Sequence, residues 1–162
     1  MNTQELLYYY TKGKRNFENI VLRACDLSWE DFKQINLCNA DLSLSMLEGV
    51  DLTGAKLINT NFFRADLTVA NLYKADLSGA NLQGADLRGA ELAYANLMFA
   101  DLRGVSLAGA DLSNAILPNG TVMPNNSIIQ RKKVISYMTK DTPVTSINRK
   151  GNSIYQYCQR SS

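Results

Sequence analysis

A five-residue repeat that runs from Arg15 to Leu117 is the feature of this sequence that most constrains its fold. Ala75-Asp76-Leu77-Ser78-Gly79 is a typical unit. Counted at every fifth position from Phe17 to Leu117, 18 of the 21 central residues are Leu and the other three are Phe. The residue two places before the centre is Ala in 12 units, and the residue directly before the centre is Asp in 9 and Asn in 6. Such regularity predicts one repetitive architecture for most of the chain.

The spacing within one unit indicates its geometry. A period of five fits neither the 3.6-residue period of a helix nor the simple alternation of a long strand. Ala75 and Leu77 are two residues apart and fall on one side of an extended segment, while Asp76 falls on the other. Ser78 and Gly79 must then turn the chain. If each unit turns it by about a right angle, four units close a square coil, and the stacked coils form a solenoid filled with Leu.

The repeated pattern Ala-Asp/Asn-Leu-x-x resembles the pentapeptide-repeat family. This resemblance implies an all-β solenoid, a right-handed quadrilateral β-helix. The 21 units correspond to about five coils, and because adjacent coils lie ~4.8 Å apart, the tower is expected to be roughly 25 Å tall. Each coil contacts mainly its neighbours, so the two ends of the solenoid need caps.

Three segments are predicted along the chain: an N-terminal capping helix at 1–14, the β-helix at 15–117 and a basic tail at 118–162. The helix is expected from Asn2 to about Lys12, with Thr3 as its N-cap and Gly13 as its end. It would cover the open edge of the first coil. Apolar residues recur at helical spacing within it: Leu6, Leu7, Tyr9 and Tyr10.

The tail differs from the repeat in both pattern and charge. Pro118-Asn119-Gly120 is a turn signal that ends the repeat. The stretch from Ile128 to Met138 is compatible with a short helix or with a strand over the last coil, and Val144 to Tyr157 is compatible with a hairpin. The tail carries 7 basic residues and 1 acidic residue, whereas 15–117 carries 8 basic and 13 acidic. The tail is therefore expected to bind the tower itself or another acidic surface.

Composition excludes several classes of activity. The chain has no His, which removes Ser-His and Cys-His nucleophiles and His-ligated metals. It has no phosphate-binding glycine loop, because its glycines fill turn positions of the repeat. Three Cys residues without CxxC spacing indicate reduced thiols, of which Cys38 is expected to face outward. We therefore expect no enzyme activity, no cofactor and no metal.

The start of the chain indicates where the protein works. It has neither the basic end nor the apolar run of a signal peptide, and no stretch approaches the ~20 apolar residues of a membrane span. A cytoplasmic location without a membrane span is expected.

The Asp and Asn column has two interpretations. Four units per coil would stack Asp31, Asp51, Asn71, Glu91 and Asp111 on one side. Such a ladder of carboxylates could bind cations or imitate a nucleic-acid backbone. Asp and Asn also bond local backbone amides at turns. The second interpretation is favoured because the same preference recurs on all four sides.

The remaining candidates for function are binding surfaces. Large apolar side chains follow the centres of several units and should face outward: Phe63, Tyr73, Tyr94, Met98 and Phe99. We expect Tyr94, Met98 and Phe99 to cluster at one corner, covered by the tail, by a second copy in a homodimer or by a partner protein.

The function predicted from the sequence is therefore a non-enzymatic protein-interaction or scaffold module. The family resemblance implies one alternative, a topoisomerase inhibitor, because some members of the family are thought to protect DNA gyrase by resembling duplex DNA. A purely structural or oligomer-forming unit is another alternative. Nucleic acid is not the expected partner.

Overall fold

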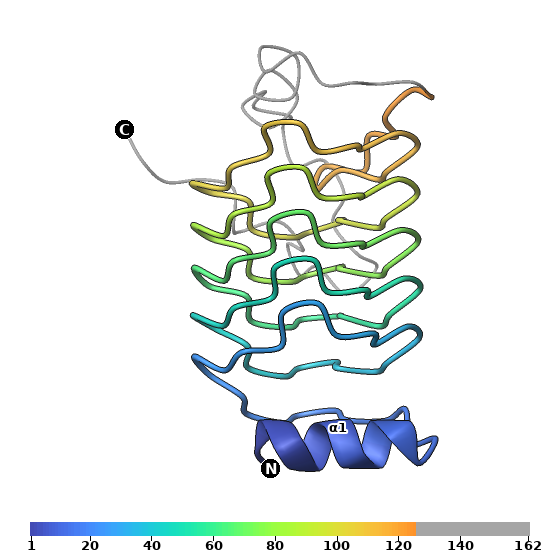
Figure 1. The fold of residues 1–162 in the computed structure, drawn as a ribbon. Helices are drawn as coiled ribbons and strands as arrows, with labels where there is room; N and C mark the ends of the chain where they lie inside the picture. Colours follow the sequence, from blue (N-terminus) through green and yellow to red (C-terminus); the bar gives the residue numbers. More distant parts are fainter. Residues whose placement is uncertain (126–162) are drawn as a thin grey trace, which may run out of the picture.

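The computed structural model describes residues 1–125, which form one helix and a stack of short coils (Figure 1). Helix α1 spans Thr3–Thr11 and lies across the first coil, at the lower end of the stack in this view. The helix or strand expected at 128–138 and the hairpin expected at 144–157 lie outside the described residues. Helix α1, the one helix within residues 1–125, is not long and apolar enough to cross a membrane.

Neighbouring coils are joined by single parallel bridges between residues 20 apart, such as Asp51 with Asn71 and Asn71 with Glu91. Each unit contributes one bridging residue, directly before its centre, so four units make one coil. The four sides are called faces A to D. The two residues that follow each centre form a corner, and this corner carries the letter of the face before it. The bridging residues are Asn16, Asn36, Lys56, Asp76, Asn96 and Ile116 on face A; Val21, Asp41, Asn61, Asn81 and Asp101 on face B; Asp26, Met46, Asp66, Asp86 and Ser106 on face C; and Asp31, Asp51, Asn71, Glu91 and Asp111 on face D.

The side chains of the Asp and Asn column hold the corners in place by hydrogen bonds to the backbone. The side-chain oxygen of Asp76 accepts a hydrogen bond from the Ser78 amide, 3.0 Å away, and Asn81 holds the Gln83 amide in the same way at 3.1 Å. The following amide closes the turn, because the Ala80 nitrogen donates to the Leu77 carbonyl at 3.0 Å. The prediction that these side chains bond local backbone at turns is confirmed.

The second residue of every corner, from Asn19 to Asn114, lies in the left-handed region with φ between 50° and 76°. Glycine and Asn adopt this backbone at the lowest cost. Gly79 also has no room for a side chain, because a Cβ there would lie 2.3 Å from Oδ1 of Asn59 in the coil below.

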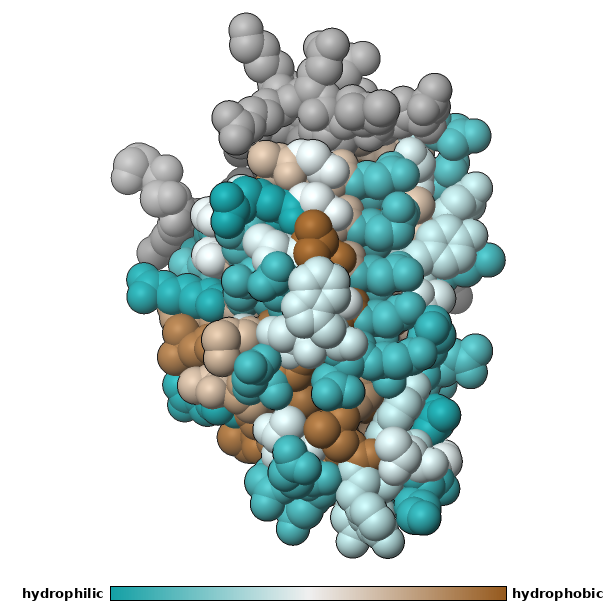
Figure 2. Space-filling view, viewed as in Figure 1, coloured by the Kyte–Doolittle hydropathy of each residue, from teal (hydrophilic) through white to brown (hydrophobic). Residues whose placement is uncertain are grey.

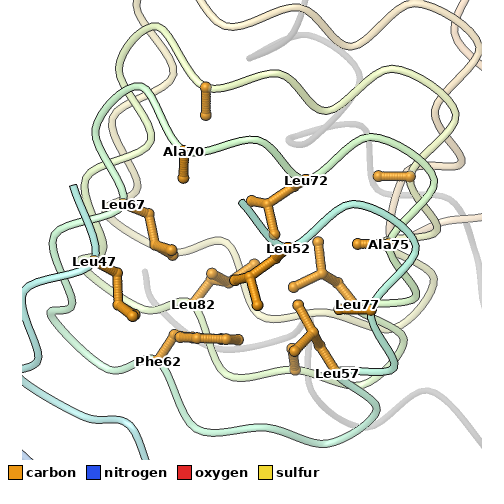
Figure 3. Packing of buried hydrophobic residues seen from close by; sticks show 14 of the residues in the cluster. Leu47, Leu52, Leu57, Phe62, Leu67, Ala70, Leu72, Ala75, Leu77 and Leu82 are labelled. Carbon is orange, nitrogen blue, oxygen red and sulfur yellow. The ribbon is translucent and has the colours of Figure 1, made fainter. Parts of the chain in front are cut away.

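The central residues fill the interior of the coil. Leu57 and Leu77 stack on face A, and Phe62 and Leu82 stack on face B, all fully buried. Figure 3 shows these side chains pointing inward from successive coils toward one another. The small residues two places before each centre complete the packing, so the core is one continuous apolar column.

Helix α1 begins at Thr3, and its N-cap lies one residue earlier than the sequence predicts. Its N-cap is Asn2, so the assignment of Thr3 as N-cap is wrong. The Asn2 side chain accepts a hydrogen bond from the Glu5 amide, and the Glu5 carboxylate accepts one from the Asn2 amide, both at 2.9 Å. This reciprocal capping box satisfies two amides at once, which favours Asn2 over Thr3.

The helix is tied to the first coil by three side chains. Leu6 is fully buried. The Tyr10 ring packs edge-on against Phe32 at 5.1 Å, and its hydroxyl donates to the Lys33 carbonyl at 3.0 Å. The Arg15 guanidinium lies 4.0 Å from the centre of the Tyr10 ring and donates to the Tyr10 carbonyl. Arg15 therefore lies at the junction of helix and coil, outside the core.

Candidate interaction site

Face D carries the acidic column that the sequence predicts, and the bridges from Asp31 up to Asp111 confirm the stacking. Its lower part is partly neutralised by the single charge of Lys33, whose ammonium lies 2.8 Å from Asp31 and 3.2 Å from Asp51. The hydrogen bond from Lys33 holds the pKa of Asp31 below its ordinary value. Partial burial opposes ionisation of Asp51, but hydrogen bonds from Thr53 and Lys33 outweigh it and lower the pKa of Asp51. Both carboxylates are therefore ionised and paired.

Some carboxylates on the other faces also have local cations. On face C, Nε of Arg88 donates to both oxygens of Asp86 at 2.9 and 2.8 Å, and this bond lowers the pKa of Asp86. Arg103 holds Asp101 on face B in the same way and lowers the pKa of Asp101. Within residues 1–125, five of the 13 acidic residues of the tower form ion pairs with Lys or Arg: Asp31, Asp41, Asp51, Asp86 and Asp101.

The upper part of face D is different. Among residues 1–125, Glu91 and Asp111 form no ion pair with Lys or Arg. Oε1 of Glu91 accepts from the Ala93 amide, and Oδ1 of Asp111 accepts from the amide and hydroxyl of Ser113. Within the described residues, the second oxygen of each carboxylate therefore has no hydrogen-bond donor and can accept one from a ligand.

An open hollow of about 670 Å³ lies over this part of face D and corner D. Its walls include Glu91, Asp111 and the rings of Tyr73 and Tyr94. The two rings meet edge to face with their centres 5.7 Å apart, and the Tyr94 side chain is 52% exposed. Asn125, at the end of the described chain, also lines the hollow. The site thus combines an aromatic pair with two carboxylates that have no ion pair within residues 1–125.

The five apolar residues predicted as one surface lie at three corners. Tyr73 and Tyr94 are together at corner D, whereas Met98 and Phe99 follow Leu97 at corner A, and Phe63 lies at corner B. The expectation that Tyr94 clusters with Met98 and Phe99 is wrong, because face A separates corner D from corner A. The aromatic partner of Tyr94 is Tyr73, which is one coil below it.

A second exposed apolar surface was missed by the sequence analysis. Trp29 is 69% exposed at corner C, and Val69 lies at the same corner two coils higher. Leu44 and Met46 stand exposed at corner B and on face C between them. In Figure 2 hydrophobic groups gather mostly over the lower coils of the visible face.

Trp29 fixes part of this surface by lying flat over Gly49. A Cβ at Gly49 would be 2.3 Å from Cε3 of the indole. Two features of the sequence could have predicted this exposed apolar surface. Met46 stands in the column that usually holds Asp or Asn, and Trp29 stands at a corner position that is usually Gly or Asn.

The two cysteines within 1–125 are free. Cys25 packs against the core, and burial raises the pKa of its thiol, which lies 3.4 Å from the Ser45 hydroxyl. Cys38 is half-buried beside face A. In this part of the chain the structure places no group of three or more Cys, Asp or Glu side chains where they would hold a metal ion.

Comparisons with known proteins agree with this geometry. A family profile described as pentapeptide repeats, in 8 copies, matches residues 16–54, 45–84 and 80–119. No curated protein matches the chain.

Among solved structures, the chain is similar to a pentapeptide repeat protein of the Arabidopsis thaliana thylakoid lumen, with 31% identity, a TM-score of 0.49 and coverage of 72% of this chain and 76% of that one. A pentapeptide repeat protein from Nostoc PCC 7120 is 34% identical, with a TM-score of 0.47 and coverage of 77% and 87%. Rfr23 from the cyanobacterium Cyanothece 51142 is 27% identical, with a TM-score of 0.47 and coverage of 71% and 99%. The repeat, its 20-residue register and the profile match establish that this chain belongs to the pentapeptide-repeat family.

Proposed function

We propose that this protein is a non-enzymatic protein-interaction or scaffold module that binds a basic segment of a partner protein at the hollow on face D. Its framework in this proposal is a right-handed quadrilateral β-helix of about five coils at 15–117, with 1–14 as the cap of the first coil and 118–162 as a basic C-terminal module. The 20-residue register and the helix across the first coil support this framework.

The filled interior argues for binding rather than catalysis. Central residues such as Leu67 and Leu87 are fully buried and leave no room for a substrate inside the coil. The hollow on face D is open to solvent and does not enclose a reacting group. Catalysis depends on groups held in a pocket that excludes water.

The observation that carries the proposal is the pairing of Tyr73 and Tyr94 beside Glu91 and Asp111. Tyrosines give large contact areas at a low cost in conformational entropy, and carboxylates with an unused oxygen attract Lys and Arg. Backbone bonds between coils fix these groups, since the Tyr94 amide donates to the Ser113 carbonyl at 2.9 Å. A preorganised surface loses little entropy on binding.

The two alternative functions gain no specific support. Imitation of duplex DNA requires dense unpaired negative charge, but Lys33, Arg88 and Arg103 compensate their neighbouring carboxylates. A purely structural unit would not require the exposed Tyr94 ring.

We expect Tyr94→Ser to weaken capture of the partner from native extract by the full chain about tenfold or more, because a central aromatic contact is lost. Tyr8→Ser is the matched control, since Tyr8 is similarly exposed but lies on α1. Quantitative mass spectrometry of the captured proteins measures both. Raising the salt concentration should weaken the same capture because the hollow is acidic. Equal capture by the Tyr94 and Tyr8 variants would contradict the assignment of the site.

A further inference from the structure

The apolar surface on the lower three coils crosses face C from corner to corner. We call it the face C surface, and its four side chains are between 47% and 69% exposed: Trp29, Leu44, Met46 and Val69. Leu44 lies at corner B, and Met46 stands in the middle of face C in the same coil. Trp29 and Val69 lie at corner C, one coil lower and one coil higher. The apolar groups therefore form a strip across the face at the level of the second coil.

The two side chains at corner C are held in place although they are exposed. The Trp29 indole lies over Gly49, and Cγ1 of Val69 would be 3.1 Å from a Cβ at Gly89. The Trp29 amide donates to the Glu48 carbonyl at 2.8 Å, which fixes the backbone of the corner. A surface ordered in this way loses little conformational entropy when a partner binds to it.

Three carboxylates surround the apolar strip. Asp26 and Asp66 stand directly below and above Met46 in the column of face C, and Glu48 follows Met46 in the same unit. All three side chains are exposed, and within residues 1–125 none of them forms an ion pair with Lys or Arg. The only cation on these three coils of the face is Arg64 at corner B. The strip is therefore flanked by negative charge on both sides.

The backbone of face C is already used between the coils. The Met46 amide donates to the Cys25 carbonyl at 2.8 Å, and the Met46 carbonyl accepts the Leu27 amide at 2.9 Å. The Asp66 amide donates to the Ser45 carbonyl at 3.0 Å. A partner strand could not add to this face by backbone pairing. A helix satisfies its own backbone groups and binds through side chains alone.

We propose that the face C surface binds an amphipathic helix of a partner protein, one whose apolar stripe is flanked by Lys and Arg. The stripe would cover Met46 and pack on Trp29, a residue type that often dominates binding energy. Cations on the two flanks would reach Asp26 and Asp66. A second copy suits the surface less well, because it would set three carboxylates and one arginine against the same set.

This surface is additional to the hollow on face D. None of its apolar or acidic residues lines that hollow, which is built from residues 53–125. The inference therefore gives the protein a second binding surface, and its test is independent of the site at Tyr94.

Trp29 is the single tryptophan of the chain, so its fluorescence reports directly on this surface. The full chain is titrated with a synthetic helix of about 18 residues, in which Leu recurs at helical spacing and Lys lies on both flanks. We expect a saturable shift of the Trp29 emission to shorter wavelength, because the helix removes the indole from water. The same peptide with Glu in place of every Lys is expected to cause no shift. Leu44→Ser with Met46→Ser should weaken binding of the Lys peptide about tenfold or more.

A pair of charge variants tests the carboxylates separately. Glu48→Gln with Asp66→Asn should weaken binding of the Lys peptide about three- to tenfold. The Asp66→Asn side chain keeps an oxygen for the Thr68 amide, so the corner stays closed. The matched control, Glu18→Gln with Asp76→Asn, removes the same charge at corner A and on face A and should leave the affinity unchanged. Circular dichroism of each variant checks that the tower remains folded.

Several results would overturn the proposal. These are the absence of a shift with the Lys peptide, equal shifts with both peptides, and equal affinities of the two charge variants. A shift that is lost in Tyr94→Ser would assign the peptide to the hollow on face D. Trp29 emission typical of a buried indole in the full chain alone would show that the chain covers its own surface. Emission that moves to shorter wavelength as the protein is concentrated would assign the surface to a second copy.

Discussion

Leu77→Asp is expected to unfold the β-helix, with a loss of more than about 4 kcal/mol in the free energy of unfolding. Leu77 is 0% exposed and stacks between Leu57 and Leu97 of the neighbouring coils on face A. A carboxylate at this depth would have no hydrogen-bonding partner and could not reach water. Because each coil packs on the next, the damage should spread along the stack. Circular dichroism and thermal melting measure the effect.

Gln83→Asp is the matched control for this change, since it introduces the same charge at an outward position. Gln83 is half-exposed at corner B, and its backbone bonds do not involve the side chain. We expect its stability to change by no more than about 0.5 kcal/mol. A Leu77→Asp protein that kept its β spectrum and melting temperature would show that the inward register is wrong.

Phe62→Ala is expected to cost about 3–5 kcal/mol, because it opens a cavity in a core that cannot collapse to fill it. The Phe62 ring is 0% exposed and lies inside the coil below Leu82 (Figure 3). The backbone bonds of the coils hold the surrounding Leu residues at fixed spacing, which limits relaxation. Urea unfolding gives the difference in free energy.

The neighbouring Phe63 provides the control. It has the same side chain but lies half-exposed at corner B, with the Arg64 guanidinium 5.2 Å from the centre of its ring. We expect Phe63→Ala to cost about 1 kcal/mol or less. Equal costs at the two positions would mean that the core does not have the rigid packing described here.

The direction of nearly every side chain in the tower could be predicted from the sequence, because one five-residue unit fixes which positions face inward. Asp76, Leu77 and Gly79 occupy the places that their types predict. The acidic column of face D followed from four units per coil. That number came from the family resemblance, since the period alone does not define the cross-section.

Surface neighbours were harder to predict, because contacts on a solenoid join residues about 20 apart. Tyr94 and Met98 are close in sequence but lie on either side of face A, whereas Tyr94 meets Tyr73 in the coil below. Trp29, Met46 and Val69 form one surface although they are spread over two coils of sequence. Sequence distance is therefore a poor guide to clusters on this fold.

The N-cap was missed for a local reason. Asn2 and Thr3 are both good capping residues. Glu5 decides between them, because it stands three residues after Asn2 and completes the capping box.

Net charge also concealed the site on face D, since charge counts do not show which carboxylates have cations beside them.

Photo-crosslinking from Tyr94 tests the central claim, that corner D binds a partner protein, most directly. A full-length protein with benzoylphenylalanine at position 94 would be irradiated in native extract, with the same group at position 8 on α1 as the exposed control. The account predicts a discrete adduct to another protein from position 94 that is absent from position 8 and is suppressed when Glu91→Gln and Asp111→Asn remove the negative charge. Identical adducts from both positions, or no adduct from position 94, would contradict it.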